Sequence, residues 1–180
     1  MSTYHHGNLP AALLRAAGRT LEKRGVGALS LRAAARRARV SHNAPYRHFP
    51  DREALLAALA AEGFAMLAEK LNTQPGRAMA EAYVRFALGH PQRFRLMFGG
   101  LLPIAKYAEL RLAAQRAQHG LIEAFKELPR PELAAAAAWS LVHGLSHLLL
   151  DGQFAESDRE AFVREVLGAM RFAVGPQRAA

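Results

Sequence analysis

Alanine and leucine outnumber the β-branched residues so strongly that they restrict the secondary structure this chain can form. The 180 residues include 38 alanines and 26 leucines, whereas valine, isoleucine and threonine together number only 12. Helices favour Ala and Leu, and strands favour β-branched side chains. The composition therefore predicts an all-α fold and argues against an all-β or a doubly wound α/β fold.

Several classes of site and segment are missing from the sequence. Cysteine is absent, which excludes disulfides, thiolate metal sites and a cysteine nucleophile. The first ten residues are polar and do not resemble a signal peptide. No apolar run reaches the roughly 18 residues of a membrane span. We therefore expect a soluble, cytoplasmic protein with no cofactor and no membrane partner.

Positive charge is concentrated at the N-terminal end of the chain. The net charge is +9, and residues 1–52 hold ten Lys or Arg but only two acids, Glu22 and Asp51. The remaining 14 basic and 13 acidic residues nearly cancel. A local basic field suggests a polyanionic partner, either nucleic acid or an anionic membrane. A solvated basic surface without a partner is the simpler alternative.

Prolines divide the rest of the chain into segments with helical periodicity. A helix rarely continues through proline, so Pro50, Pro75, Pro91, Pro103 and Pro129 are predicted breaks. Apolar residues recur every three or four positions between these breaks, and no useful length alternates with period two. Asp51, which follows Pro50, can cap the long helix that comes next.

The first 52 residues contain the signals of three short helices. Asn8 is a good N-cap for the first helix, and Gly25 suits the position just after its end. Ser30 is a second N-cap. Ser41 caps a third short helix, which we expect to end near Phe49. The second and third helices are separated by about three residues, and this spacing predicts a helix-turn-helix.

These residues resemble the DNA-binding domain of TetR-type transcriptional regulators. The similarity lies in LRAAARRARVSHNAPYRHF, residues 31–49, followed directly by PDREALLAAL. The opening YHHGNL, residues 4–9, also resembles one branch of that family. Trp139, His143 and Gly144 resemble the signature of the branch that carries a so-called WHG domain, and HPQRFRLMF, residues 90–98, fits that branch.

The resemblance implies a DNA-reading domain over residues 1–52, joined to a larger helical ligand-binding and dimerisation domain over residues 53–180. The protein would be a ligand-responsive regulator, expected to be a repressor, that binds a palindromic operator on double-stranded DNA as a homodimer associated with the nucleoid. The third helix would lie in the major groove. The residues carried over as DNA contacts are Ser30, Arg32, Ser41, His42, Asn43, Ala44, Tyr46, Arg47, His48 and Arg52.

Two positions depart from the family pattern. Many members carry glycine in the tight turn where this chain has Arg39. If that residue is left-handed, arginine costs roughly 1 kcal/mol there. Pro45 falls inside the expected recognition helix, within about one turn of the Ser41 cap, where it removes at most one helical hydrogen bond.

Two apolar residue sets are candidates for a ligand pocket and for a dimer interface. Aromatic and Met side chains at helical spacing also form ordinary cores, which is the simpler interpretation of the pocket set. The expected pocket for a small apolar effector comprises Phe86, Phe94, Met97, Phe98, Leu101, Leu102 and Tyr107. The expected dimer interface, formed by the last two long helices, comprises Leu141, Leu145, Leu148, Phe162, Val166 and Met170.

Other chemistry-bearing residues have simpler interpretations. His143 and His147 lie four residues apart, as zinc ligands on a helix do, but no third ligand is placed to complete the site. We expect them to pack near Trp139 with hydrogen-bonded imidazoles and predict no metal. Ser140, His143 and Asp151 have the side chains of a hydrolase triad, but no nucleophile elbow accompanies them. We therefore do not expect an enzyme.

Three functions remain open from the sequence. The first is a ligand-responsive, sequence-specific regulator. The second is a DNA-binding regulator without a small-molecule effector. The third is a basic helical enzyme or a membrane-surface protein. An enclosed apolar cavity separates the first two, and a charge excess on the face of the third helix argues against the last.

Overall fold

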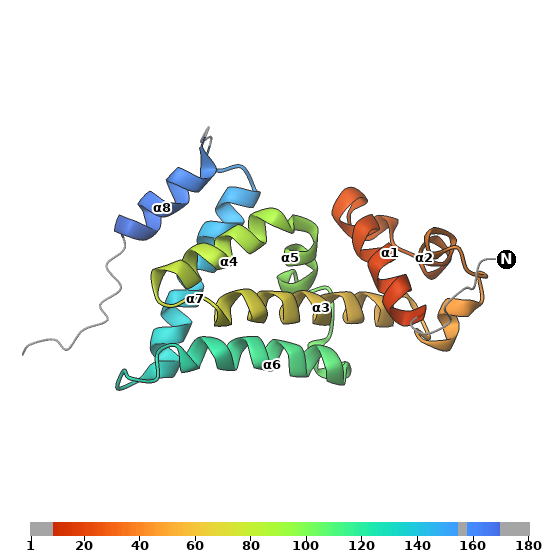
Figure 1. Ribbon diagram of the computed structural model, residues 1–180, viewed down its shortest axis with the longest axis horizontal. Helices are drawn as coiled ribbons and strands as arrows, with labels where there is room; N and C mark the ends of the chain where they lie inside the picture. The colour runs from red at the N-terminus through yellow and green to blue at the C-terminus, as the bar shows by residue number, and fades with distance from the viewer. Residues whose placement is uncertain (1–8, 155–157, 170–180) are drawn as a thin grey trace, which may run out of the picture. The chain divides into compact units, whose positions relative to one another are not determined.

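The computed structural model describes residues 9–154 and 158–169, and over these residues it is built from helices without strands (Figure 1). The prediction of an all-α fold is confirmed. The α-helices are α1 (Leu9–Arg24), α2 (Leu31–Ala38), α3 (Arg52–Asn72), α4 (Arg77–Gly89), α5 (Pro91–Phe98), α6 (Ala108–Glu123), α7 (Pro131–Leu150) and α8 (Arg159–Ala169). Three short 3-10 helices are η2 (Val26–Ala28), η3 (Ala44–Arg47) and η4 (Ile104–Lys106).

The chain forms two compact units, whose boundaries fall inside α3, between α4 and α5, and inside α6. One unit comprises residues 1–65 and 90–115, which include α1, α2, η3 and α5. The other comprises residues 66–89 and 116–180, which include α4, α7 and α8. We call these the head unit and the tail unit.

Local capping explains where the helices of the head unit begin and end. Gly25 follows α1 with φ 71°, and its N–H bonds to the carbonyl of Leu21 at 2.8 Å. The Ser30 hydroxyl accepts a hydrogen bond from Ala33 N at 3.1 Å, so it caps α2 as the sequence predicts. Asp51 caps α3 in the same way, accepting from Ala54 N at 2.8 Å. α1 packs against both α2 and α5.

The third helix is shorter than the sequence predicts. We expected a helix from the Ser41 cap to near Phe49, but only Ala44–Arg47 is helical, in the 3-10 form. Pro45 lacks an N–H and cannot donate a hydrogen bond at the position where an α-helix begun at Ser41 would need one. His48 N bonds three residues back to the carbonyl of Pro45 at 2.9 Å, which is the 3-10 pattern.

The turn before this element contains strained backbone. Arg39 has φ 57° and ψ 41°, and no other non-glycine residue described by the structure has a positive φ. Its N–H bonds to the carbonyl of Arg36 at 3.2 Å, and Val40 N reaches the carbonyl of Ala35 at 3.1 Å. This is the usual left-handed end of a helix, formed here without the customary glycine.

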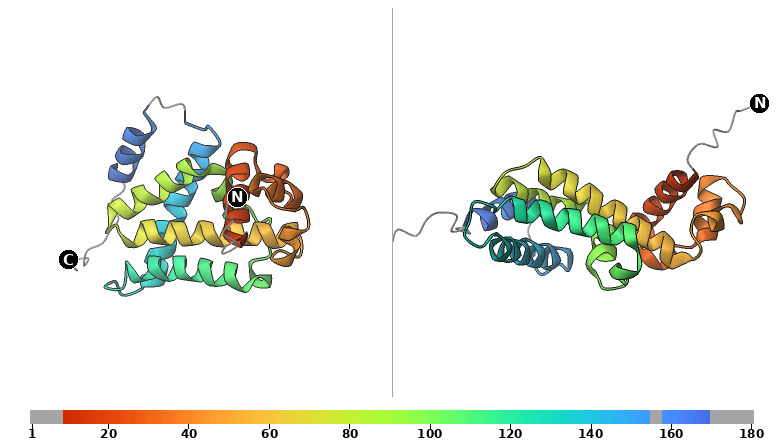
Figure 2. Two further views of the ribbon diagram at one scale, coloured as in Figure 1. Left: turned by 45° about the vertical axis from the view of Figure 1, so that its right-hand side comes forward. Right: turned by 90° about the horizontal axis from the view of Figure 1, so that it is seen from below.

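The tail unit is organised around α4, which packs against both α7 and α8 (Figure 2). Tyr83 and Phe86 of α4 are buried. On α7 the buried residues are Ala135, Val142, Leu145, Ser146 and Leu149, and on α8 they are Val163 and Leu167. Of the residues expected to form a dimer interface, Leu145 is therefore buried within its own unit.

Candidate nucleic-acid interface

The residues expected to contact DNA lie on the surface of the head unit. Ser30 and Arg32 are exposed at the start of α2, and Arg52 is exposed at the start of α3. The others follow one another from the turn into η3. Ser41, His42, Asn43, Tyr46, Arg47 and His48 are exposed, and Ala44 is half-buried.

Two buried residues anchor η3 beneath its exposed side chains. Pro45 and Phe49 are buried, whereas Tyr46 between them is 48% exposed. α2 packs against η3, and the burial of Leu31, Ala34 and Ala35 on α2 completes the small core. η3 therefore presents polar and aromatic side chains from a fixed base, as direct contact with bases and phosphates requires.

Arg52 makes contacts that the sequence did not predict. Its Nε donates to the carbonyl of Leu29 at 2.8 Å and its Nη2 to the carbonyl of Val26 at 2.6 Å. The guanidinium thus holds the segment before α2 against the start of α3. A phosphate clamp by Arg52 would use its remaining donors, since a guanidinium has five N–H groups.

Additional basic side chains surround the same surface. Arg36 and Arg37 are exposed in the last turn of α2, and Arg39 is exposed in the turn that follows. Favourable interaction with the negative end of the helix dipole stabilises cations at this position. These three arginines contribute to the charge excess of the first 52 residues. The sequence placed that excess in this part of the chain but did not show which surface carries it.

The residues expected to line an effector pocket are only partly brought together. Phe98 lies 4.9 Å from Phe94 and 5.2 Å from Phe64, measured between ring centroids. Met97 lies against Gly63, where an added Cβ would be 2.6 Å from its Sδ. Phe94, Met97 and Phe98 therefore pack on α3 within the head unit.

The other expected pocket residues have different surroundings. Leu101 is 52% exposed and Leu102 is buried, whereas Phe86 belongs to the tail unit. Tyr107 donates its hydroxyl hydrogen to Glu53 Oε1 at 2.5 Å, and Lys106 Nζ reaches the same oxygen at 2.6 Å. Hydrogen bonds from Lys106 and Tyr107 lower the pKa of Glu53, and the hydrogen bond to Glu53 raises the pKa of Lys106 to about 12.

The two α7 histidines take part in a hydrogen-bonded aromatic cluster in the tail unit. Trp139 Nε1 donates to the Tyr83 hydroxyl at 3.0 Å, and that hydroxyl is hydrogen-bonded to His143 Nδ1 at 2.8 Å. The His143 and His147 rings lie 4.7 Å apart. The expectation of helix packing near Trp139 with a hydrogen-bonded imidazole is confirmed. Within the described residues, no group of three His, Asp or Glu side chains could hold a metal ion.

One face of α7 remains apolar and exposed. An 18-residue window of this helix has mean hydropathy 1.5, but only 28% of it is buried. Five exposed residues repeat at helical spacing along this face: Leu133, Ala137, Ser140, Gly144 and Leu148. Glu132, Ala136 and Trp139 of α7 are exposed as well. α7 is long and apolar enough to cross a membrane, judged by length and composition only. Core helices of soluble proteins meet the same criteria. On α8, Phe162 and Val166 are half-buried, and Met170 lies outside the described residues.

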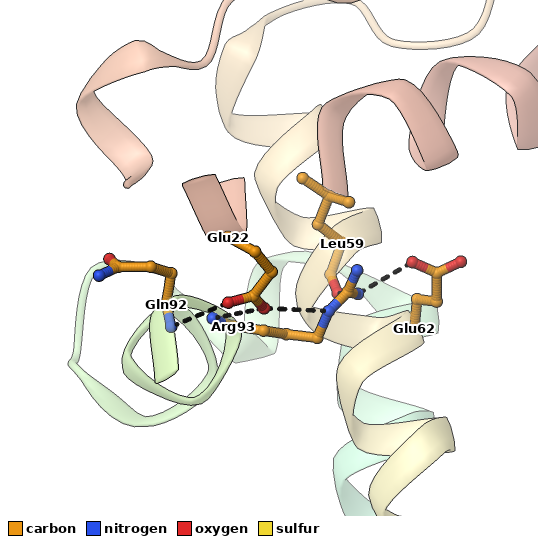
Figure 3. Close-up of polar contacts among 5 residues, drawn as sticks. All are labelled: Glu22, Leu59, Glu62, Gln92 and Arg93. Atoms are coloured by element: carbon orange, nitrogen blue, oxygen red, sulfur yellow. Dashed lines mark hydrogen bonds and ion pairs between the residues drawn. The ribbon is translucent and has the colours of Figure 1, made fainter. Parts of the chain in front are cut away.

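Sequence reasoning missed an ionic cluster in the head unit. Arg93 of α5 is only 7% exposed, and its Nη1 lies 2.9 Å from Glu62 Oε2 of α3 (Figure 3). Its Nε lies 4.0 Å from Glu22 Oε1 of α1. Glycines at positions 18 and 63, inside two otherwise good helices, were the only sequence signal that a bulky side chain crosses them.

Two family models match the chain. Residues 13–59 match the model described as "Bacterial regulatory proteins, tetR family", and residues 77–170 match "Tetracyclin repressor-like, C-terminal domain". No curated protein matches the sequence.

Solved structures with the same fold are also found. A protein of unknown function from Rhodococcus sp. RHA1 is 33% identical with a TM-score of 0.81, and the match covers 94% of this chain and 96% of that one. A bacterial regulatory protein in the tetR family from Rhodococcus RHA1 is 19% identical with a TM-score of 0.65, covering 88% and 93%. AibR, solved with isovaleryl coenzyme A and operator DNA, is 18% identical with a TM-score of 0.63, covering 89% and 96%.

Proposed function

Because the chain belongs to the TetR family of bacterial regulatory proteins, we propose that it is a ligand-responsive repressor that binds a palindromic operator as a homodimer. At the coarser level it is a DNA-binding transcription regulator. The matched families are those of regulators and not of a catalytic protein. We further propose that it acts in the cytoplasm, at the nucleoid.

The observation that carries the proposal is the exposed surface of η3 on its buried base. Asn43 and Arg47 have side chains able to make bidentate contacts to adenine and guanine. Tyr46 and His48 would meet phosphates, as would Ser30 and Arg32 at the start of α2. This assignment supports a reading domain over residues 1–52 and a ligand-binding and dimerisation domain over residues 53–180. Two separate family models, matching residues 13–59 and 77–170, support a chain of two parts.

Selection of bound duplexes from a random library tests the DNA-binding function. We expect one enriched motif with two inverted half-sites, because the two-fold axis of a dimer repeats in its operator. Affinity for the selected duplex should fall about a thousandfold or more between about 50 and about 200 mM salt, because several phosphate contacts release counterions. Enrichment of no motif would contradict sequence-specific regulation.

The exposed face of α7 supports the homodimer. Gly144 lies in the middle of this helix, and within the described residues no atom outside its own stretch of helix would come within 4 Å of an added Cβ. An interior helix glycine costs about 1 kcal/mol relative to alanine, so packing within the chain does not explain it. The close approach of a second α7 does, and Leu148 would add apolar area to a four-helix interface with α8.

The Tyr83 cluster supports assignment to the branch with a WHG domain. Trp139 and His143 of that signature are joined through the Tyr83 hydroxyl, and Gly144 lies beside them on the exposed face of α7. In this proposal the Trp and His fix α7 against α4, while the glycine admits the partner helix.

The packing of α5 on α3 supports a small, mostly apolar effector in the head unit. Phe98 is half-buried and contacts both Phe94 and Phe64, so a ligand could replace one of these ring contacts. A thermal-shift screen of apolar compounds about the size of leucine tests this proposal. A hit is a compound that raises the melting temperature of the protein. Phe98→Ala should abolish the stabilisation by a hit and leave operator affinity within a few-fold. An unchanged thermal shift in that variant would exclude this location.

The alternative is a regulator without an effector. Phe94 is fully buried, as a purely structural core residue would be. Failure of every apolar compound to alter operator affinity would favour that alternative.

A further inference from the structure

The buried guanidinium of Arg93 joins three helices of the head unit. Its Nη1 donates to the Leu59 carbonyl and to the Glu62 carboxylate, both on α3 and both at 2.9 Å (Figure 3). Its Nε faces the Glu22 carboxylate of α1 at 4.0 Å. A buried cation requires such partners, since removing one leaves an uncompensated charge.

Glu22 also caps the helix that carries Arg93. Its two carboxylate oxygens accept hydrogen bonds from Gln92 N and Arg93 N, each at 3.3 Å. α5 begins at Pro91, which has no N–H, and its N-cap His90 makes no side-chain cap bond. The acceptor that completes the first turn of α5 is therefore supplied by α1, and its negative charge suits the positive end of the α5 dipole.

Two glycines make room for this arrangement. A Cβ on Gly18 of α1 would lie 2.8 Å from Arg93 Nη2. A Cβ on Gly63 of α3 would lie 2.6 Å from Met97 Sδ and 3.0 Å from Arg93 Cγ. Each glycine costs its helix about 1 kcal/mol relative to alanine, so α1 is adapted to Arg93 and α3 to Arg93 together with Met97.

We propose that Arg93 is a positioning residue for DNA binding, and that the Glu22–Arg93–Glu62 cluster makes α1 and α5 move as one body. α1 packs on α2 of the helix-turn-helix. α5 carries Phe94 and Phe98, whose rings contact each other. The cluster therefore connects the DNA-reading surface to the helix proposed to meet an effector. This inference rests on the proposed function and adds a specific connection to it.

Hydrogen exchange with and without DNA tests the connection. The probe is the operator duplex selected from the random library, and the readout is exchange of the 92–98 backbone amides. In the unsubstituted protein, DNA binding should slow this exchange several-fold, although α5 itself is not expected to touch DNA. Glu22→Gln should abolish that slowing, because it removes the charge shared by the cap and Arg93. Loss of a merely structural contact would not remove a DNA-dependent change.

A matched control is available on α3. Glu69 is an exposed carboxylate on the helix that carries Glu62, and Glu69→Gln should leave the slowing intact. Equal slowing in the Glu22→Gln variant and the unsubstituted protein, or no slowing in the unsubstituted protein, would overturn the inference. Arg93→Met provides a second variant and should behave as Glu22→Gln does.

The free protein separates this inference from the proposed function. Without DNA, Glu22→Gln should speed exchange of the first α5 turn about tenfold relative to Glu69→Gln, because its cap is weakened. If the protein selects no operator, the proposed function fails, and faster free-state exchange in Glu22→Gln would still support the joining of α1 and α5 by the Glu22–Arg93–Glu62 cluster. Unchanged free-state exchange would overturn that joining whether or not DNA is bound.

Discussion

Arg39 has a strained backbone conformation. Its left-handed backbone, φ 57°, closes α2 and directs the chain toward η3. Any side chain with a Cβ is disfavoured there, whereas a cation adds to the basic surface near η3. Arg39 therefore lowers the stability of the fold but adds positive charge beside the proposed DNA contacts.

Arg39→Gly should stabilise the protein by about 0.5 to 1 kcal/mol, measured by urea denaturation. Relief of left-handed strain is worth about 1 to 2 kcal/mol, and the greater freedom of unfolded glycine offsets part of it. Arg39→Ala is the control, because it removes the same charge and keeps the strain. Equal stability of the two variants would show that charge, and not backbone conformation, governs the change.

His143 makes stability depend on pH. Burial, and then the neighbouring His147, lower the pKa of His143 from its usual 6.5. The unfolded chain therefore takes up a proton at higher pH than the folded chain does. The stabilisation is fully present above about pH 6.5 and is lost as the pH falls through the folded-state pKa.

Urea denaturation between pH 7.5 and pH 5.5 checks this dependence, with both values chosen to lie about one unit from the ordinary histidine pKa. The free energy of unfolding should decrease on acidification, and less so in His143→Gln, which cannot titrate. Identical slopes in the two proteins would assign the pH dependence to other groups.

At the scale of elements, different residues in and beside η3 are proposed to contact bases and phosphates. Tyr46 is a large exposed aromatic on this element, and Asn43 is its N-cap residue, whose side chain makes no cap hydrogen bond. Pro45 shortens η3 but is itself buried, so it fixes the element in place while neighbouring side chains remain exposed.

Tyr46→Ala should weaken binding to the selected operator and to a scrambled duplex alike, by about tenfold, because phosphate contacts carry no sequence information. Asn43→Ala should instead reduce discrimination between the two duplexes by about 1 to 3 kcal/mol. Fluorescence anisotropy titrations at one fixed salt concentration measure both effects. Normal operator binding by Tyr46→Ala would show that the phosphate assignment is wrong.

At the scale of the whole molecule, the apolar face of α7 predicts the state of assembly. Gly144→Leu should convert the dimer to a monomer at micromolar concentration, because a large side chain separates two helices that meet at this glycine. Gly144→Ala, which adds a single methyl group, should remain dimeric. Sedimentation velocity distinguishes the two.

A dimeric Gly144→Leu variant would move the interface elsewhere, and a monomeric unsubstituted protein would contradict the homodimer. Circular dichroism of each variant serves as the control for folding, since Gly144 is exposed and neither change should disturb the tail unit.

The sequence by itself determined the helical class and several helix ends of the head unit. The predicted Ser41 cap was wrong, because η3 begins after Asn43, and the predicted Asn8 cap lies outside the described residues. Ser30 and Asp51 cap the helices they were predicted to cap, and Gly25 ends α1. These features depend on interactions within four residues, which local sequence specifies. The basic bias of residues 1–52 was likewise visible without coordinates, because it is a property of composition.

Only the tertiary structure decided which side chains meet across distant segments. Glu22, Glu62 and Arg93 are separated by at least 31 positions, and no local pattern marks them as one cluster. The same is true of Tyr83 and His143, and of Tyr107, whose hydroxyl bonds to Glu53. Periodicity identifies a helix face but not its neighbour, so it could not tell that Leu145 is buried while Leu148 is exposed.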